Sequence, residues 1–98
     1  MKKKIFDAYV KAICNECDLT EGELFLKSKR QVFCEPRHLL YYVCSKRNMR
    51  LVDIQRYLKD FGYDSLHSPI KNGIEKAEKK IKKDKDVKAV YNRVKNAI

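Results

Sequence analysis

The chain has 98 residues, which is room for one domain over residues 1–98 but not for two. Charged residues make up 37% of it, and Lys and Arg exceed Asp and Glu by ten, whereas Gly (3) and Pro (2) are few. These numbers exclude collagen-like and low-complexity chains and disfavour a turn-rich β domain. A charge of +10 on so short a chain favours a polyanionic partner.

The sequence also argues against a membrane or a secreted location. No apolar run approaches the roughly 20 residues that span a bilayer. The basic start resembles that of a signal peptide, but Asp7 and Lys11 interrupt the apolar stretch that follows. We therefore expect a cytoplasmic protein with no membrane partner.

The basic residues are unevenly distributed. Residues 1–26 carry a net charge of −1, residues 27–50 of +6 and residues 51–98 of +5. The excess begins at the cluster Lys27-Ser28-Lys29-Arg30, and Arg37 follows it. A solvated helix face usually mixes both signs. This block therefore predicts phosphate binding, with solubility alone as the simpler alternative.

The first half of the chain predicts three helices. Apolar residues at spacings of three and four mark an amphipathic helix over residues 5–17. Thr20 and Glu23 form a capping-box pattern before a short helix that runs through Leu26. Pro36 suits the first position of a third helix, whose apolar stripe continues to Cys44.

The second half predicts two or three more helices and no strand. A helix over 51–61 ends at Gly62, and Ser68 with Pro69 opens the next, which runs to residue 83. Gly73 inside that helix suggests close approach by another helix or by a DNA backbone. The last helix begins with Asp84 or Asp86 as its cap, and its inward stripe is Val87, Val90, Val94 and Ile98. The fold class predicted is all-α with five to six helices.

Two of these helices form a candidate helix-turn-helix over about residues 51–83. In such units the N-terminal residues of the second helix meet base edges in the major groove. The residues at that position are His67, Ser68, Lys71 and Asn72, and each type is able to read a base. The simpler alternatives are a capping or packing role for His67 and a solvated position for Asn72.

Several short motifs occur in a familiar order between about Leu19 and Ile81. They are Glu23-Leu24-Phe25, Lys27-Ser28-Lys29-Arg30, Pro36-Arg37-His38, Leu51-x-x-Ile54, His67-Ser68-Pro69-Ile70 and Gly73-Ile74. This order resembles the C-terminal DNA-binding domain (domain IV) of the DnaA replication initiator, a Trp-repressor-like helix-turn-helix fold. It covers roughly two thirds of the chain, as a motif hypothesis.

The resemblance implies roles for particular residues. Lys29, Arg30 and Arg37 would contact phosphate or the minor groove, and His67 and Ser68 would read bases. Leu66 stands where the family has an Asp, and Pro69 where it has a hydroxyl residue. We therefore do not expect binding to the initiator's usual box. Without the family's ATPase domain, we expect a stand-alone DNA-binding protein of a bacterium or phage-infected cell.

Other chemistry is not expected from these residues. Cys14-x-x-Cys17 has ligand spacing, but Cys34 and Cys44 do not form the second close pair that a structural zinc site needs. No acid–base pair or activated nucleophile stands out. There is no phosphate-binding Gly-rich loop, so we expect neither catalysis nor a metal, nucleotide or other cofactor.

Two functional hypotheses remain open. The first is a sequence-specific double-stranded DNA-binding protein, a replication accessory or transcription regulator at the nucleoid, in which Lys27, Lys76, Lys79 and Lys80 add phosphate contacts. The second is a non-catalytic helical protein whose basic face binds nucleic acid non-specifically or docks an acidic protein. In either case, the apolar stripe of residues 87–98 suggests a homodimer. Tyr63 is the aromatic residue that we expect to be exposed.

Overall fold

Six helices make up the structure, a computed structural model that describes residues 2–97 and contains no strand in that range. They are α1 (Lys2–Cys17), α2 (Glu21–Leu24), α3 (Gln31–Lys46), α4 (Leu51–Asp60), α5 (His67–Lys83) and α6 (Lys85–Asn96). The all-α prediction with five to six helices is confirmed. Between residues 2 and 97, no helix is both long and apolar enough to cross a membrane.

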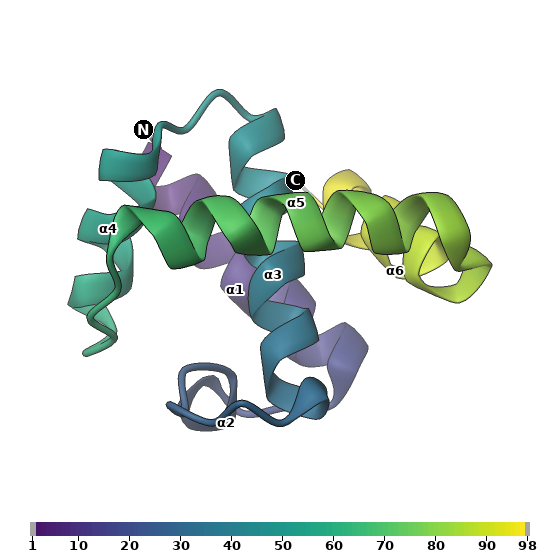
Figure 1. The fold of residues 1–98 in the computed structure, drawn as a ribbon, viewed down its shortest axis with the longest axis horizontal. Helices are drawn as coiled ribbons and strands as arrows, with labels where there is room; N and C mark the ends of the chain where they lie inside the picture. The colour runs from purple at the N-terminus through teal and green to yellow at the C-terminus, as the bar shows by residue number, and fades with distance from the viewer. Residues whose placement is uncertain (1, 98) are drawn as a thin grey trace.

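Helix α3 is the central element. Helix α5 crosses one side of it, and α1 lies on the other side (Figure 1). Leu40, Val43 and Cys44 of α3 are almost completely buried, as are Phe6 and Tyr9 of α1. The amphipathic stripes predicted from periodicity therefore meet around α3, which holds the core together.

The crossing of α3 and α5 depends on Gly73. A Cβ atom at this position would lie 2.8 Å from Cδ2 of His38 and 2.8 Å from Cδ2 of Tyr41. Those distances are far below van der Waals contact, so only a residue without a side chain fits there. The close approach expected at Gly73 is thus an approach between helices.

Three predicted helix boundaries are confirmed. Thr20 Oγ1 accepts a hydrogen bond from the Glu23 amide, and the Glu23 carboxylate accepts one from the Thr20 amide. Asp84 caps α6 by accepting from the amides of the second and third helical residues. Gly62 has φ +77° and completes a Schellman motif at the end of α4, where the Tyr63 amide binds the Leu58 carbonyl.

Two boundaries differ from the prediction in the segment between α2 and α3. Helix α3 begins at Gln31, so Pro36 lies in its second turn and removes only one intrahelical hydrogen bond near the helix end. Helix α2 ends at Leu24 instead of continuing through Leu26, because the carbonyls of both leucines accept hydrogen bonds from the Arg37 guanidinium.

The start of α5 also differs from the prediction. The sequence predicts that Ser68, as the cap before Pro69, opens this helix, but the N-cap is Leu66, and no side chain caps the first amides. His67 instead enters the first turn, where its ring is hydrogen-bonded to Gln55 of α4. A tertiary contact between α4 and α5, and not a local cap, therefore sets this boundary.

Candidate nucleic-acid interface

Gln55 of α4 holds the turn between α4 and α5 through two side-chain hydrogen bonds. Its Nε2 donates a hydrogen bond to the Ser65 carbonyl at 2.8 Å, and its Oε1 lies 2.9 Å from Nε2 of His67. Because the Gln55 amide nitrogen is already committed to Ser65, its oxygen accepts and His67 Nε2 donates. The imidazole is held at the start of α5, and its Nδ1 remains free to interact elsewhere.

The four predicted base-reading residues are all exposed in the first two turns of α5. They are His67, Ser68, Lys71 and Asn72. Helix α5 buries Ile70, Gly73 and Ala77 against the core, and this leaves the other faces open. The exposure needed for groove contact is therefore present at every one of the four positions.

Helical spacing divides these residues between two faces. Asn72 and Lys76 are four residues apart, and Lys79 and Lys83 continue the same row, so these side chains share one acid-free face. Lys71 lies on the adjoining flank with Glu75. The acid-free face of α5 is the one that borders the segment around Lys29.

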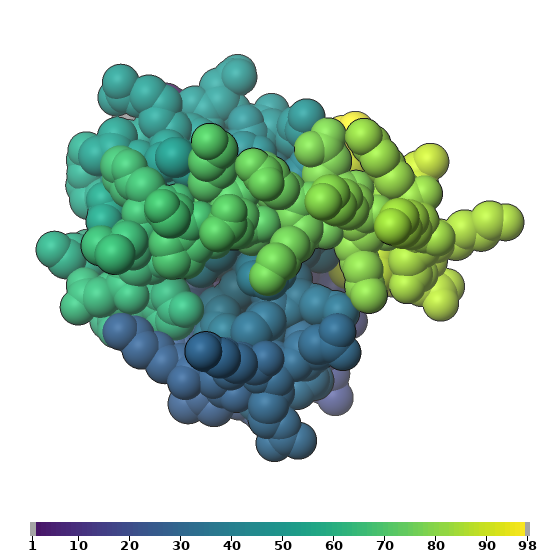
Figure 2. Space-filling model, viewed as in Figure 1, coloured from purple at the N-terminus to yellow at the C-terminus, as the bar shows by residue number. Residues whose placement is uncertain are grey.

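The basic loop before α3, residues 26–30, lies on the same side of the molecule. Figure 2 shows this segment and the start of α3 below the band formed by α5, with a hollow between them. Lys27, Lys29 and Arg30 are exposed. Two basic segments that are about 50 residues apart in the chain thus lie on one face.

Arg37 does not belong to this exposed surface, and its predicted contact with phosphate or the minor groove is corrected. Only 4% of it is exposed. Its guanidinium donates to the carbonyls of Leu24, Leu26 and Ser28, the last at 2.7 Å. A cation that is buried in this way is engaged with the chain and cannot reach a phosphate.

The aromatic ring of Tyr63 links the basic loop to the turn before α5. The carbon Cζ of Arg37 lies 5.2 Å from the ring centroid, and Nζ of Lys27 lies 5.7 Å from it. Phe25 packs against the same ring at 6.1 Å between centroids. Tyr63 is therefore half-buried, in contrast to the exposed position expected from the sequence.

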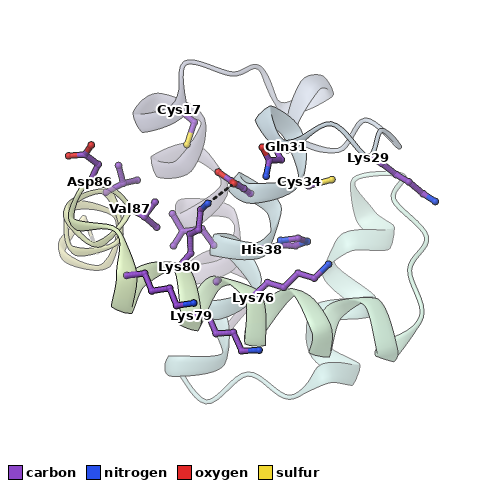
Figure 3. A pocket seen from close by; sticks show the side chains of 15 residues that line it. Cys17, Lys29, Gln31, Cys34, His38, Lys76, Lys79, Lys80, Asp86 and Val87 are labelled. Carbon is purple, nitrogen blue, oxygen red and sulfur yellow. Dashed lines mark ion pairs between the residues drawn. The ribbon is translucent and has the colours of Figure 1, made fainter.

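A cleft of about 970 Å³ separates the basic loop and α3 from α5 and α6. Figure 3 shows Lys29 on the loop and Lys76, Lys79 and Lys80 on α5, with His38 of α3 between the two walls. Lys80 forms an ion pair across the cleft with Glu35, at 3.3 Å. The pKa of His38 is lowered by burial and by the nearby charges of Lys76 and Arg37.

The apolar stripe of α6 is used inside the molecule. Val94 is fully buried, and Val90 packs against the core cluster. Val87 is half-buried, and both it and Val90 line the cleft between α3, α5 and α6. Ile98, the last predicted member of the stripe, lies outside the described residues. None of the described members is fully exposed, so the stripe does not present an open apolar face to a second copy.

The four cysteines are distributed between the core and the surface of the cleft. Cys14 and Cys44 are buried, and burial raises the pKa of the Cys44 thiol. Cys17 and Cys34 are half-buried and line the cleft. Within residues 2–97, no three His, Cys, Asp or Glu side chains are grouped so that they could hold a metal ion.

Three residues that shape this region were not singled out from the sequence for the roles they have. Gln55 carries no pattern that distinguishes it from a solvated helix residue, and Tyr63 and His38 acquire their roles only when α3, α4 and α5 pack together. His38 directly follows Pro36 and Arg37 in the sequence, but the sequence does not show that its ring packs against Gly73 of α5.

No family model, curated protein or solved structure matches the chain. The resemblance to the DnaA C-terminal domain therefore stays a prediction from its motifs. The structure itself shows a six-helix architecture over residues 2–97 in which the basic loop and the polar faces of α5 are exposed.

Proposed function

We propose that this protein binds double-stranded DNA through a helix-turn-helix formed by α4 and α5. The N-terminal turns of α5 enter the major groove, and the basic loop of residues 26–30 contacts phosphates or the adjacent minor groove. This is the arrangement that the resemblance to the DnaA C-terminal domain implies.

The observation that carries the proposal is the shared face of two basic segments. The basic loop and the acid-free row of α5 lie on one face, although they are far apart in sequence. Lys29 of the loop and the lysines of the row border the same cleft, and Lys27 and Arg30 are exposed in that loop. Duplex DNA presents phosphates on both sides of a groove, so a reader needs cations on both sides of its inserted helix.

The residues have separate roles in this proposal. Asn72 is suited to adenine and Lys71 to guanine, whereas His67 and Ser68 accept or donate according to the base. Lys76 and Lys79 contact phosphates farther along α5. Lys80 does the same after its ion pair with Glu35 breaks. Arg37 is a positioning residue that holds the loop and does not touch DNA.

The wider biological role is part of the same proposal. The protein acts in the cytoplasm, at the nucleoid, as a replication accessory or a transcription regulator, and it needs no nucleotide or other cofactor. A homodimer through α6 is not included, because none of the described stripe residues is fully exposed: Val94 lies in the core, and Val87 and Val90 border the cleft.

The test is selection of binding sites from a random duplex pool near physiological salt. Sequence reading predicts enrichment of a defined motif and its loss in the variants His67→Ala and Asn72→Ala, since each good base contact is worth about 1–3 kcal/mol of discrimination. Binding without enrichment of a motif would contradict base reading and support the alternative, in which the basic face binds nucleic acid non-specifically. No binding to any duplex would contradict both.

A second measurement separates phosphate contacts from base contacts. Arg30→Ala should weaken binding to all sequences equally and reduce the slope of log affinity against log salt by about one. Lys11→Ala is the matched control, because it removes one exposed positive charge from α1, on the other side of α3 from α5 (Figure 1). Equal effects of the two variants would mean that only total charge matters.

A further inference from the structure

The cleft beside α5 combines a positive rim with an apolar floor. Leu39 of α3, Ala77 of α5 and Val87 and Val90 of α6 contribute the apolar side chains. The rim carries five lysines, whereas Glu35 and Asp86 are the carboxylates among the lining residues. These are two separate chemical features at one site: apolar surface to cover and positive charge to neutralise.

The lysines of the rim are not equivalent. Lys80 is engaged with Glu35 at 3.3 Å, while the other four rim lysines form no ion pair among residues 2–97. Among these four, Lys76 and Lys79 lie within one turn of α5 and so place two unengaged cations side by side at the edge of the cleft. The two lysines are thus the group that a ligand's anion would meet.

The volume and the lining narrow the class of occupant. A cleft of about 970 Å³ is at the upper end of the range for sites that hold organic molecules. An inorganic anion would leave the apolar side chains of the floor exposed to water, and a neutral apolar molecule would leave the lysine charges without a counter-charge. A nucleic-acid backbone also brings no apolar group to cover Val87 and Val90.

We propose that this cleft binds an amphipathic organic anion, with its carboxylate, sulfonate or phosphate group at Lys76 and Lys79 and its apolar body on the floor between α3 and α6. Covering apolar floor contributes about 25 cal/mol for each Å² removed from water. The two lysines orient the ligand and select it by charge.

Occupancy of the cleft has a consequence for DNA binding that rests on the proposed function. Lys76 and Lys79, which would hold the anion of the ligand, are also proposed phosphate contacts. An anion bound between them competes for the same positive charge, so the ligand would weaken DNA binding. Because ligand and DNA exclude each other, DNA would weaken ligand binding by the same factor.

The test uses the intact chain without DNA and three probes. The first is 1-anilinonaphthalene-8-sulfonate, which has both an anion and an apolar body. The second is N-phenyl-1-naphthylamine, which has the same body without the sulfonate, and the third is inorganic sulfate. We expect the first probe to bind at least about tenfold more tightly than either of the others. Equal affinity of the two aromatic probes would overturn the role of the lysines.

Matched variants locate the site. The double variant Lys76→Gln with Lys79→Gln should weaken binding of the anionic probe by about fivefold to tenfold and leave the neutral probe unchanged. Its control, Lys71→Gln with Lys82→Gln, removes the same charge from the other flank of α5. Equal losses in the two double variants would show that binding follows net charge and not the cleft.

The floor is tested by Val90→Thr, which keeps the volume of the side chain but adds a hydroxyl. It should weaken binding of both aromatic probes by about threefold. Val52→Thr, at an exposed position on α4, is the control and should have no effect. Amide shifts in two-dimensional NMR should cluster at His38, Ala77 and Val90. Shifts spread over the whole core would overturn the site.

A last readout is independent of fluorescence. Charged groups that face His38 are Lys76 from α5 and Arg37 and Glu35 from its own helix. An anion bound at Lys76 offsets the positive charges and should raise the pKa of His38, measured from the imidazole proton shift. An unchanged pKa would contradict binding there. If the probe binds but duplex DNA does not, the proposed DNA binding is contradicted, whereas the proposed binding of an organic anion in the cleft is supported.

Discussion

Arg30 and Arg37 lie seven residues apart and have opposite environments. The Arg30 side chain is exposed, whereas Arg37 is buried and donates to three backbone carbonyls of the segment 24–28. The same cationic group is thus available to a partner in one case and committed to the fold in the other. Sequence position alone does not separate these two roles, because both residues belong to one basic block.

This contrast predicts different effects of two alanine substitutions. Arg37→Ala leaves the carbonyls of Leu26 and Ser28 without their buried donors and should lower the free energy of unfolding by about 3 kcal/mol. Arg30→Ala should change it by less than about 0.5 kcal/mol. Urea unfolding followed by circular dichroism measures both. Similar losses would mean that Arg37 does not hold the loop.

At the scale of elements, the crossing of α3 and α5 sets the geometry of the interface. Gly73 allows α5 to approach His38 and Tyr41, and this contact fixes which face of α5 borders the cleft. The same packing buries Ala77 and leaves Lys76 and Lys79 beside the opening. The position of the proposed DNA contacts is therefore a consequence of one close helix crossing.

Gly73→Ala tests that crossing. Alanine gains about 1 kcal/mol in helix propensity, but its Cβ would lie 2.8 Å from two packed aromatic carbons, and overpacking costs about 1–3 kcal/mol. We expect a net loss of about 1–2 kcal/mol in thermal or urea unfolding. Gly22→Ala, whose Cβ would be 3.8 Å from Thr20 Oγ1, should be neutral or stabilising. Stabilisation by both substitutions would show that the helices separate freely.

At the scale of the whole molecule, the dominant feature is a net charge of +10 on 98 residues. Seven ion pairs occur among the described residues, and most of their partners are partly exposed, so they offset little of the repulsion. Charge repulsion destabilises the folded state, and salt reduces it within a Debye length of about 10 Å.

The melting temperature should therefore rise with salt. Between about 20 and 300 mM NaCl we expect an increase of about 5 °C, which corresponds to roughly 1 kcal/mol of screened repulsion. A variant with Lys79, Lys82, Lys83 and Lys88 changed to Gln should show a smaller increase and a higher melting temperature at low salt. Calorimetry measures both quantities. A melting temperature that falls with salt would contradict net repulsion.

Much of the fold was accessible from residue patterns. Apolar spacing predicted the helices, and Thr20, Gly62 and Asp84 predicted three of their ends, because caps and amphipathic stripes depend on neighbours within a few residues. The ends set by Arg37 and by Gln55 were predicted wrongly, since both are determined by contacts between separate elements.

Local chemistry thus established an all-α chain, its approximate helix boundaries and its excess of positive charge. Long-range packing established which of those charges are available: it buried Arg37, exposed Lys29, and set Lys76 and Lys79 beside an apolar cleft. The physical reason is that helix formation follows interactions over three or four residues. The burial of a side chain depends instead on which helices meet, and here that depends on the contact of Gly73 with His38 and Tyr41.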